Sequence, residues 1–167
     1  MTREGSPLSL REMGEEDIEG ACRLIADSMN RDEARWARRT MGFHFGCKKH
    51  GLDDGRHYFV YPVDEPVKGL VGLHHYPWGP EENVWLSWFA VDPRFQEQGI
   101  GRALLASVQE LAVGMGFSKL FVETYSQREF QKARRFYEAN GFQKAGHIKD
   151  YSPSSHDMIV FKKQLVA

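Results

Sequence analysis

The chain has 167 residues, 41% hydrophobic and 27% charged, and its 22 Lys and Arg residues nearly balance 23 Asp and Glu residues, for a net charge of −1. This length predicts about one domain, and the composition is that of a soluble globular domain, which excludes the disordered, collagenous and coiled-coil classes. Without a basic excess we expect no nucleic-acid partner, and without an apolar run of about 18 residues we expect no membrane partner.

Cysteine usage and the start of the chain predict the compartment. Two cysteines are too few for a disulfide framework, and residues 1–7 contain no apolar signal-peptide core. We therefore expect a single cytoplasmic domain over residues 1–167.

Hydrophobic periodicity and turn residues predict seven strands and four helices. In chain order the predicted elements are a strand at 8–13, helices at 18–29 and 32–43, strands at 57–62, 68–75 and 83–91, a helix at 99–115, a strand at 119–123, a helix at 128–139, and strands at 142–150 and 157–164. The strand at 83–91 is apolar on both faces apart from Ser87, which is typical of a strand covered on both sides. The strand, helix and strand over 83–123 predict a right-handed parallel crossover, and the flanking hairpins predict a mixed sheet.

The segment from Val91 to Ala103 carries the clearest chemical signal. A buried strand ends there, a loop follows, and Gly99 and Gly101 begin an amphipathic helix. Glycine permits close approach of a ligand, and the first N–H groups of a helix have no partner inside it, so this turn suits an anion such as a diphosphate. A plain glycine-rich helix start is the structural alternative.

Two other phosphate-binding patterns compete with this reading. A P-loop requires a Gly-Lys pair, which the chain lacks. A dinucleotide fingerprint fits Gly99-x-Gly101, with Glu123 at about the expected distance for a ribose-binding acid. However, Leu104 occupies the third glycine position, and a long loop separates strand from glycines, so a nicotinamide or flavin site is disfavoured.

Two sequence motifs resemble the GNAT acetyltransferase superfamily. They are Phe89-Ala90-Val91-Asp92-Pro93 followed by Gln96-x-x-Gly99-x-Gly101, and Ala133-x-x-Phe136-Tyr137-Glu138-Ala139-Asn140-Gly141-Phe142. The predicted order of elements agrees from residue 8 to residue 165. The resemblance implies an α/β domain of GNAT type: a mixed, mostly antiparallel central sheet with a parallel splayed strand pair and helices on both faces.

The resemblance also implies acetyl-CoA as co-substrate, with no metal. The main chain of Phe89, Ala90 and Val91 would pair with the pantetheine arm like an added strand. The diphosphate would be held by backbone N–H groups of the following turn, which are those of Gln96, Glu97, Gln98, Gly99, Ile100, Gly101, Arg102 and Ala103.

The implied reaction is N-acetyl transfer to a primary amine of a small molecule, peptide or protein, by direct attack in a ternary complex. Tyr137 would lie near the thioester sulfur as general acid or hydrogen-bond donor, and its alternative role is a core tyrosine. The resemblance also makes a homodimer a plausible oligomeric state. A non-catalytic acyl-CoA-binding or regulatory module of the same fold is the alternative function.

The general base is not obvious from the sequence. Relatives often carry a glutamate in the strand at 83–91, where this chain offers only Ser87. Glu123 is the best catalytic carboxylate, with a solvated strand-end acid as its alternative, and His74 and His75 follow, pointing to opposite faces of their strand. Catalysis through water, or without a base, stays open.

One position departs from the family pattern. Phe130 stands where relatives often carry an asparagine that contacts the cofactor arm, so we expect Phe130 to pack against the arm or Gln127 or Gln131 to replace that contact.

The loops at 76–80 and 151–156 are candidate edges of the acceptor pocket. A possible metal-ligand pattern is the recurrence at every third residue of His44, Cys47 and His50. On a helix, each step of three residues turns the side chain by about 60° around the axis, and no fourth ligand lies at a suitable spacing, so zinc is disfavoured. We expect these three residues to lie in a helix end and loop.

Overall fold

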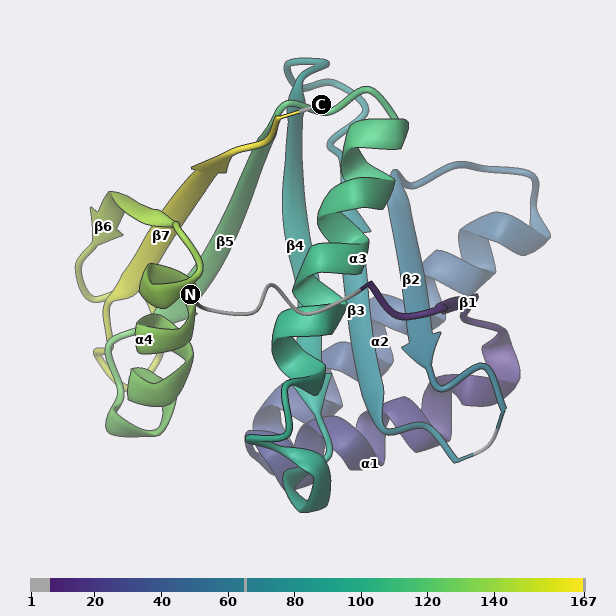
Figure 1. The fold of residues 1–167 in the computed structure, drawn as a ribbon, viewed down its shortest axis with the longest axis horizontal. Coiled ribbons are helices and arrows are strands. Elements are labelled where there is room, and N and C mark those ends of the chain that lie inside the picture. Colours follow the sequence, from purple (N-terminus) through teal and green to yellow (C-terminus); the bar gives the residue numbers. More distant parts are fainter. Residues whose placement is uncertain (1–6, 65, 167) are drawn as a thin grey trace.

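A single seven-stranded sheet with helices on both faces organises the computed structural model, which describes residues 7–64 and 66–166 (Figure 1). The prediction that residues 1–7 contain no signal-peptide core falls mostly on residues 1–6, which lie outside the described residues. The strands, in the order β1-β2-β3-β4-β5-β7-β6, are β1 (Arg11–Glu12), β2 (Arg56–Tyr61), β3 (Gly69–His74), β4 (Asn83–Val91), β5 (Lys119–Tyr125), β7 (Met158–Gln164) and β6 (Gln143–Ile148). The α-helices are α1 (Ile18–Ser28), α2 (Arg31–Lys49), α3 (Ile100–Gly114) and α4 (Gln131–Ala139), and three short 3-10 helices are η1 (Glu15–Asp17), η2 (Pro93–Phe95) and η3 (Arg128–Phe130).

The sheet is mixed, as predicted. Strands β4 and β5, joined by α3, run parallel, and the other neighbouring strands are antiparallel. Two hydrophobic clusters cover its two faces. Residues of α3 and α4 such as Leu104, Val108 and Tyr137 belong to one, and residues of α1 and α2 such as Ile25 and Met41 belong to the other. Among the described helices, none is long and apolar enough to cross a membrane.

Two predicted boundaries were wrong. The first strand is reduced to β1, because the N–H of Leu8 donates to Ser107 Oγ of α3 at 2.7 Å instead of pairing along the sheet. Helix α2 continues to Lys49, beyond the predicted end at residue 43, so His44 and Cys47 lie within the helix and His50 caps it. The buried side chains Ala37, Met41 and Phe45 form one stripe across that supposed end.

Strand β4 contains a bulge that determines the shape of the sheet centre. Leu70 pairs with Ala90 and Gly72 with Ser87, so β4 contributes one residue more than β3 over this interval. Trp88 takes a positive φ of 42° at the bulge. A bulge bends its strand and increases its local twist. The ladder between β4 and β5 ends just before the bulge, since their pairing covers only Asn83, Val84 and Trp85 of β4.

Candidate active site

The divergence of β4 and β5 lies within a cavity of about 970 Å³. At the last paired position, the rings of Trp85 and Phe121 stack with centroids 5.1 Å apart. Residues 86–91 of β4 and 122–125 of β5 then have no ladder between them, so polar backbone edges face the opening. Unpaired backbone groups require water or a ligand as partner. An extended, amide-containing molecule matches this requirement.

The start of α3 supplies unpartnered backbone donors at one end of the cavity. Gly99 occupies the N-cap position with φ 84°, and no side chain caps the helix. Within the described residues, the N–H groups of 97–102 have no hydrogen-bond acceptor, whereas those of Gln96 and Ala103 already donate to Pro93 and Gly99. Glu97 also has a positive φ of 63°. The donors of 97–102, together with the positive end of the helix dipole, suit a diphosphate.

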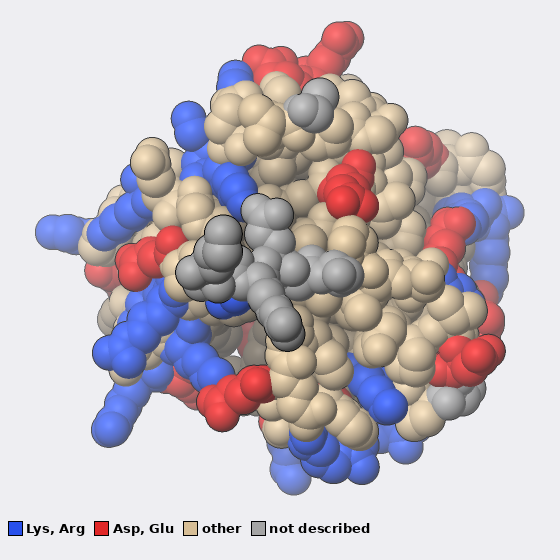
Figure 2. Space-filling view, viewed as in Figure 1, with Lys and Arg blue, Asp and Glu red and all other residues tan. Residues whose placement is uncertain are grey.

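Polar side chains hold this turn in place. Gln96 Nε2 donates to the carbonyl of Val91 at 3.0 Å, and Lys132 Nζ donates to Gln96 Oε1 at 3.2 Å and to Glu97 Oε1 at 3.1 Å. Arg102 and Lys132 also line the cavity. Figure 2 shows Lys and Arg side chains around the loop before α3 and over α4. A positive field at this end of the cavity favours an anionic ligand.

The structure brings most of the predicted site residues into this one cavity. Gln98, Ile100 and Ala103 are the predicted coenzyme contacts that do not line it, and Ala103 is buried in the core. The predicted residues that do line it are Phe89, Ala90, Val91, Gln96, Glu97, Gly99, Gly101, Arg102, Glu123 and Tyr137. The turn can hold the diphosphate through fewer N–H groups than the sequence suggested.

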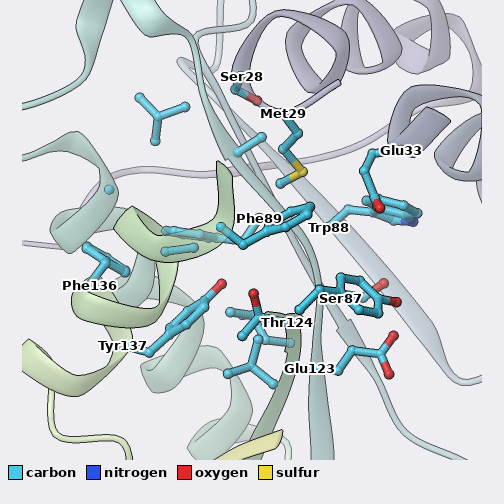
Figure 3. A pocket seen from close by; sticks show the side chains of 18 of the residues that line it. Ser28, Met29, Glu33, Ser87, Trp88, Phe89, Glu123, Thr124, Phe136 and Tyr137 are labelled. Carbon is cyan, nitrogen blue, oxygen red and sulfur yellow. The ribbon is translucent and has the colours of Figure 1, made fainter. Parts of the chain in front are cut away.

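Tyr137 projects from α4 toward the opening, and its ring packs between Phe89, Phe142 and Phe161 with centroid distances of 5.5–6.5 Å (Figure 3). Its hydroxyl has no hydrogen-bond partner among the described residues. Burial raises the pKa of Tyr137 far above that of a free phenol. The hydroxyl therefore keeps its proton at neutral pH and acts as a hydrogen-bond donor.

Glu123 and Thr124 are neighbours on β5, so their side chains point to opposite faces of the sheet. Figure 3 shows Thr124 beside Tyr137 and Glu123 on the side of the cavity away from Tyr137. The Oγ1 atom of Thr124 is buried and has no hydrogen-bond partner among the described residues. The Glu123 side chain is exposed to the open cavity, yet desolvation by the surrounding walls raises its pKa above the usual glutamate value. A raised pKa improves a carboxylate as a proton acceptor.

Glu33 is a site residue that sequence reasoning missed. It lies in the first turn of α2 and lines the same cavity as Glu123. Burial raises the pKa of Glu33, and the negative charges of Glu123 and Glu129 raise it further. The spacing Asn30-x-x-Glu33 was the signal in the sequence, because it is typical of a helix start. The Oδ1 atom of Asn30 indeed accepts the N–H of Glu33 at 2.8 Å.

The two histidines considered as bases have different surroundings. His74 lines the cavity, and burial, with the nearby positive charge of Arg56, lowers its pKa to about 4. Such an imidazole is neutral at pH 7 but too weak a base to compete with Glu123 for an amine proton. The Nδ1 atom of His75 donates a 2.9 Å hydrogen bond to the carbonyl oxygen of Asn83, its ring packs on Phe117, and it does not line the cavity.

Several aromatic side chains complete the walls. Phe130 lines the cavity and packs edge-to-face on Tyr125, and Tyr125 stacks on Tyr151. Each candidate loop contributes its first residue to the lining, namely Tyr76 and Tyr151, whereas Trp78 is 84% exposed outside it. Gln127 and Gln131 do not line the cavity.

In the part of the chain that the structure describes, no group of three or more His, Cys, Asp or Glu residues could hold a metal ion. Asp54 and His44, which lie close together, have a structural role. Asp54 accepts a 2.9 Å hydrogen bond from Arg56 and shares a 2.8 Å bond with His44 Nδ1, which ties α2 to the start of β2.

Comparisons with known proteins agree with this geometry. The chain is 32% identical to the uncharacterized N-acetyltransferase YsnE of Bacillus subtilis (strain 168), over 51% of this chain and 72% of that protein. It matches the crystal structure of a GNAT-family protein from Desulfovibrio desulfuricans with a TM-score of 0.82 and 26% identity, covering 95% of this chain and 99% of that one. An aminoglycoside 6'-N-acetyltransferase crystallised with coenzyme A shares the fold with a TM-score of 0.73 at 11% identity, covering 96% and 98%. Residues 19–142 match the Acetyltransferase (GNAT) family, and the chain therefore belongs to this family.

Proposed function

We propose that this protein transfers an acetyl group from acetyl-CoA to a primary amine by direct attack in a ternary complex. The observation that carries the proposal is the opening between β4 and β5, which ends at the uncapped start of α3. One end offers unpartnered N–H groups for a diphosphate, and the strand edges offer partners for an amide-bearing arm. The fold shared with the coenzyme A-bound aminoglycoside acetyltransferase supports the same assignment.

The residues present fit acetyl-CoA, whose thioester supplies an activated acyl group. The turn over 97–102 would hold the diphosphate, and the backbone of Phe89 and Ala90 would hold the pantetheine arm. Phe89 and Phe136, stacked 5.6 Å apart, would form the apolar wall along the arm.

The acceptor would enter from the other face of the sheet, where Glu123 lies. A lysine-like amine with a pKa near 10.4 is almost fully protonated at about pH 7, and the nitrogen must lose a proton in order to attack. Glu123, with its raised pKa, would take that proton directly or through water. The new N–C bond forms as the C–S bond breaks, the nitrogen loses its second proton to solvent to give the amide, and the departing sulfur carries the negative charge.

Tyr137 would donate a hydrogen bond to that sulfur. Full proton transfer from an ordinary tyrosine to a thiolate is unfavourable by about 2 kcal/mol, since their pKa values are near 10 and 8.5. Burial raises the pKa of Tyr137 and makes complete transfer less favourable still. The hydroxyl therefore stabilises the thiolate without giving up its proton, and the thiolate takes its proton later from solvent.

Thermal unfolding with acetyl-CoA, followed by a screen of amines with thiol-release detection, tests the proposal. At 100 times its dissociation constant, acetyl-CoA should stabilise the fold by about 2.7 kcal/mol, which is roughly 5–10 °C for this size. NAD is the control and should have no effect. Stabilisation by NAD alone would refute the coenzyme assignment. Stabilisation by acetyl-CoA with slow hydrolysis, no amine acceptor and no effect of Tyr137→Phe would instead identify a non-catalytic acyl-CoA-binding module.

A further inference from the structure

Three carboxylates line the acceptor side of the cavity, and they come from three separate elements. Glu33 lies on α2, Glu123 on β5 and Glu129 on η3. Figure 3 shows Glu33 and Glu123 on the same side of the cavity, away from Tyr137 and Phe136. Burial raises the pKa of Glu33, and the negative charges of Glu123 and Glu129 raise it further, so both carboxylates act electrostatically on Glu33.

Among the residues that the structure describes, no Lys or Arg forms an ion pair with any of these three carboxylates. Within the described residues Glu33 and Glu123 make no ion pair, and Glu129 accepts a hydrogen bond from the neutral Asn30 amide. Arg56 lines the cavity, but its guanidinium is bonded to Asp54 at 2.9 Å. Lys132 is bonded to Glu97 at 3.1 Å, at the start of α3. The wall therefore presents a net negative field to whatever enters.

Independent observations indicate that the cavity as a whole receives a polar ligand, with Thr124 on its Tyr137 side and not beside the carboxylates. The hydroxyl oxygens of Thr124 and Ser28 are buried without a hydrogen-bond partner among the described residues, and both residues line the cavity. Thr124 is 4% exposed, and Figure 3 shows its hydroxyl directed into the cavity. Such groups are costly to leave unpaired. Trp36, Tyr76 and Tyr151 add aromatic surfaces at 40–52% exposure, which attract cations.

The chemistry of amine transfer decides which cation fits. The attacking nitrogen must be neutral at the moment of attack, so an acceptor with a single amine then has no positive charge to balance the negative charge of the three carboxylates. An acceptor with a second cationic group retains a positive charge throughout. We propose, resting on the proposed function, that the acceptor is an amine with a second cationic group, held by Glu33 and Glu129 while Glu123 receives the proton of the attacking amine.

Kinetics with two amines of equal chain length, pentylamine and cadaverine, at saturating acetyl-CoA test this inference. We expect kcat/KM for the diamine to exceed that for the monoamine by at least about tenfold, the effect of one charge-assisted hydrogen bond. Glu33→Gln should raise the KM for cadaverine about tenfold and change that for pentylamine less than about twofold. Glu81→Gln is the matched control, because Glu81 is exposed outside the cavity, and it should change neither.

Each contrary result has a separate meaning. Equal kcat/KM for the two amines, or an equal effect of Glu33→Gln on both, would overturn the inference that the acceptor carries a second cationic group. Acetylation of neither amine, with acetyl-CoA still stabilising the fold, would overturn this inference and leave coenzyme binding intact. Failure of acetyl-CoA to stabilise the protein would instead count against the proposed function. Thermal unfolding of each variant at equal concentration verifies that the substituted proteins are folded.

Discussion

The Nδ2 atom of Asn30 donates a 2.8 Å hydrogen bond to Oε1 of Glu129, although the two residues are 99 positions apart in the chain. The same asparagine caps α2 through its Oδ1 atom. One side chain therefore fixes the start of α2, which carries Glu33, relative to η3, which carries Glu129. This link sets the separation of two carboxylates in the acceptor wall.

Asn30→Ala should lower stability and impair acceptor binding. Loss of the cap costs about 1 kcal/mol, which corresponds to roughly 2–4 °C in Tm for a domain of this size. Asn30→Asp is the matched control, since aspartate also caps helices but places a charge against Glu129. We expect Asn30→Asp to recover the Tm and not the KM for the acceptor. Equal KM values for wild type and Asn30→Asp would show that the link to Glu129 has no role in binding.

Gly99→Ala should weaken both the fold and the coenzyme site. At φ 84° an L-residue is strained by about 1–2 kcal/mol, while an added Cβ would meet no atom within 4 Å, so the backbone alone is responsible. Gly20→Ala, in α1 with equally open space, should instead stabilise by about 0.5–1 kcal/mol. Urea unfolding measures both effects, and acetyl-CoA titration measures binding. An unchanged dissociation constant in Gly99→Ala would argue against this turn as the diphosphate site.

Tyr137→Phe should reduce kcat without loss of stability. A hydrogen bond to a charged sulfur contributes about 1.5–3 kcal/mol, so kcat should fall roughly 10- to 100-fold with the KM for acetyl-CoA nearly unchanged. The hydroxyl has no partner among the described residues, so its removal leaves no group unpaired. Tyr61→Phe, on β2 outside the cavity lining, is the control for loss of a phenol. An unaltered kcat in Tyr137→Phe would exclude the tyrosine from the reaction.

Glu33→Gln should stabilise the ligand-free protein at neutral pH. A raised carboxyl pKa means that the folded state favours the protonated form; the resulting stability is fully present below the unfolded-state pKa of about 4.3 and is lost as pH rises through the folded-state value. The gain in Tm from Glu33→Gln should thus be present near about pH 7 and absent below about pH 4. Glu19→Gln should do the opposite, because Arg38 lowers the pKa of Glu19. A Tm difference for Glu33→Gln that is independent of pH would contradict this assignment.

The sequence predicted the sheet better at its centre than at its edge. The bounds of β4 agree with the prediction because a strand buried on both faces reads as a continuous apolar run between turns. At the edge, β1 has a single paired neighbour, and Ser107 of α3 competes for the backbone of Leu8. The predicted end of helix α2 at residue 43 was too early, because Phe45 continues its buried stripe.

The cavity lining at the start of α3 could be predicted from local motifs, whereas the contribution of Glu33 could not. Residues 89–103 lie in one stretch of chain, and helix-start chemistry is local. Glu33 approaches Glu123 only through packing of α2 across the sheet, and no spacing rule connects residues 90 positions apart. The bulge at Trp88 likewise depends on the register of β4 with β3, so no local sequence pattern indicates its positive φ.

The short ladder between β4 and β5 has a mechanical consequence. Three residue pairs join the half of the sheet containing β1 to β4 to the half containing β5 to β7, and the chain crosses between the halves through α3. A molecule that binds to both strand edges would therefore hold the two halves together for as long as it stays bound. Backbone amide hydrogens of β4 and β5 at the opening should therefore exchange more slowly with the molecule bound. After it dissociates, the two halves of the sheet should move more freely relative to each other.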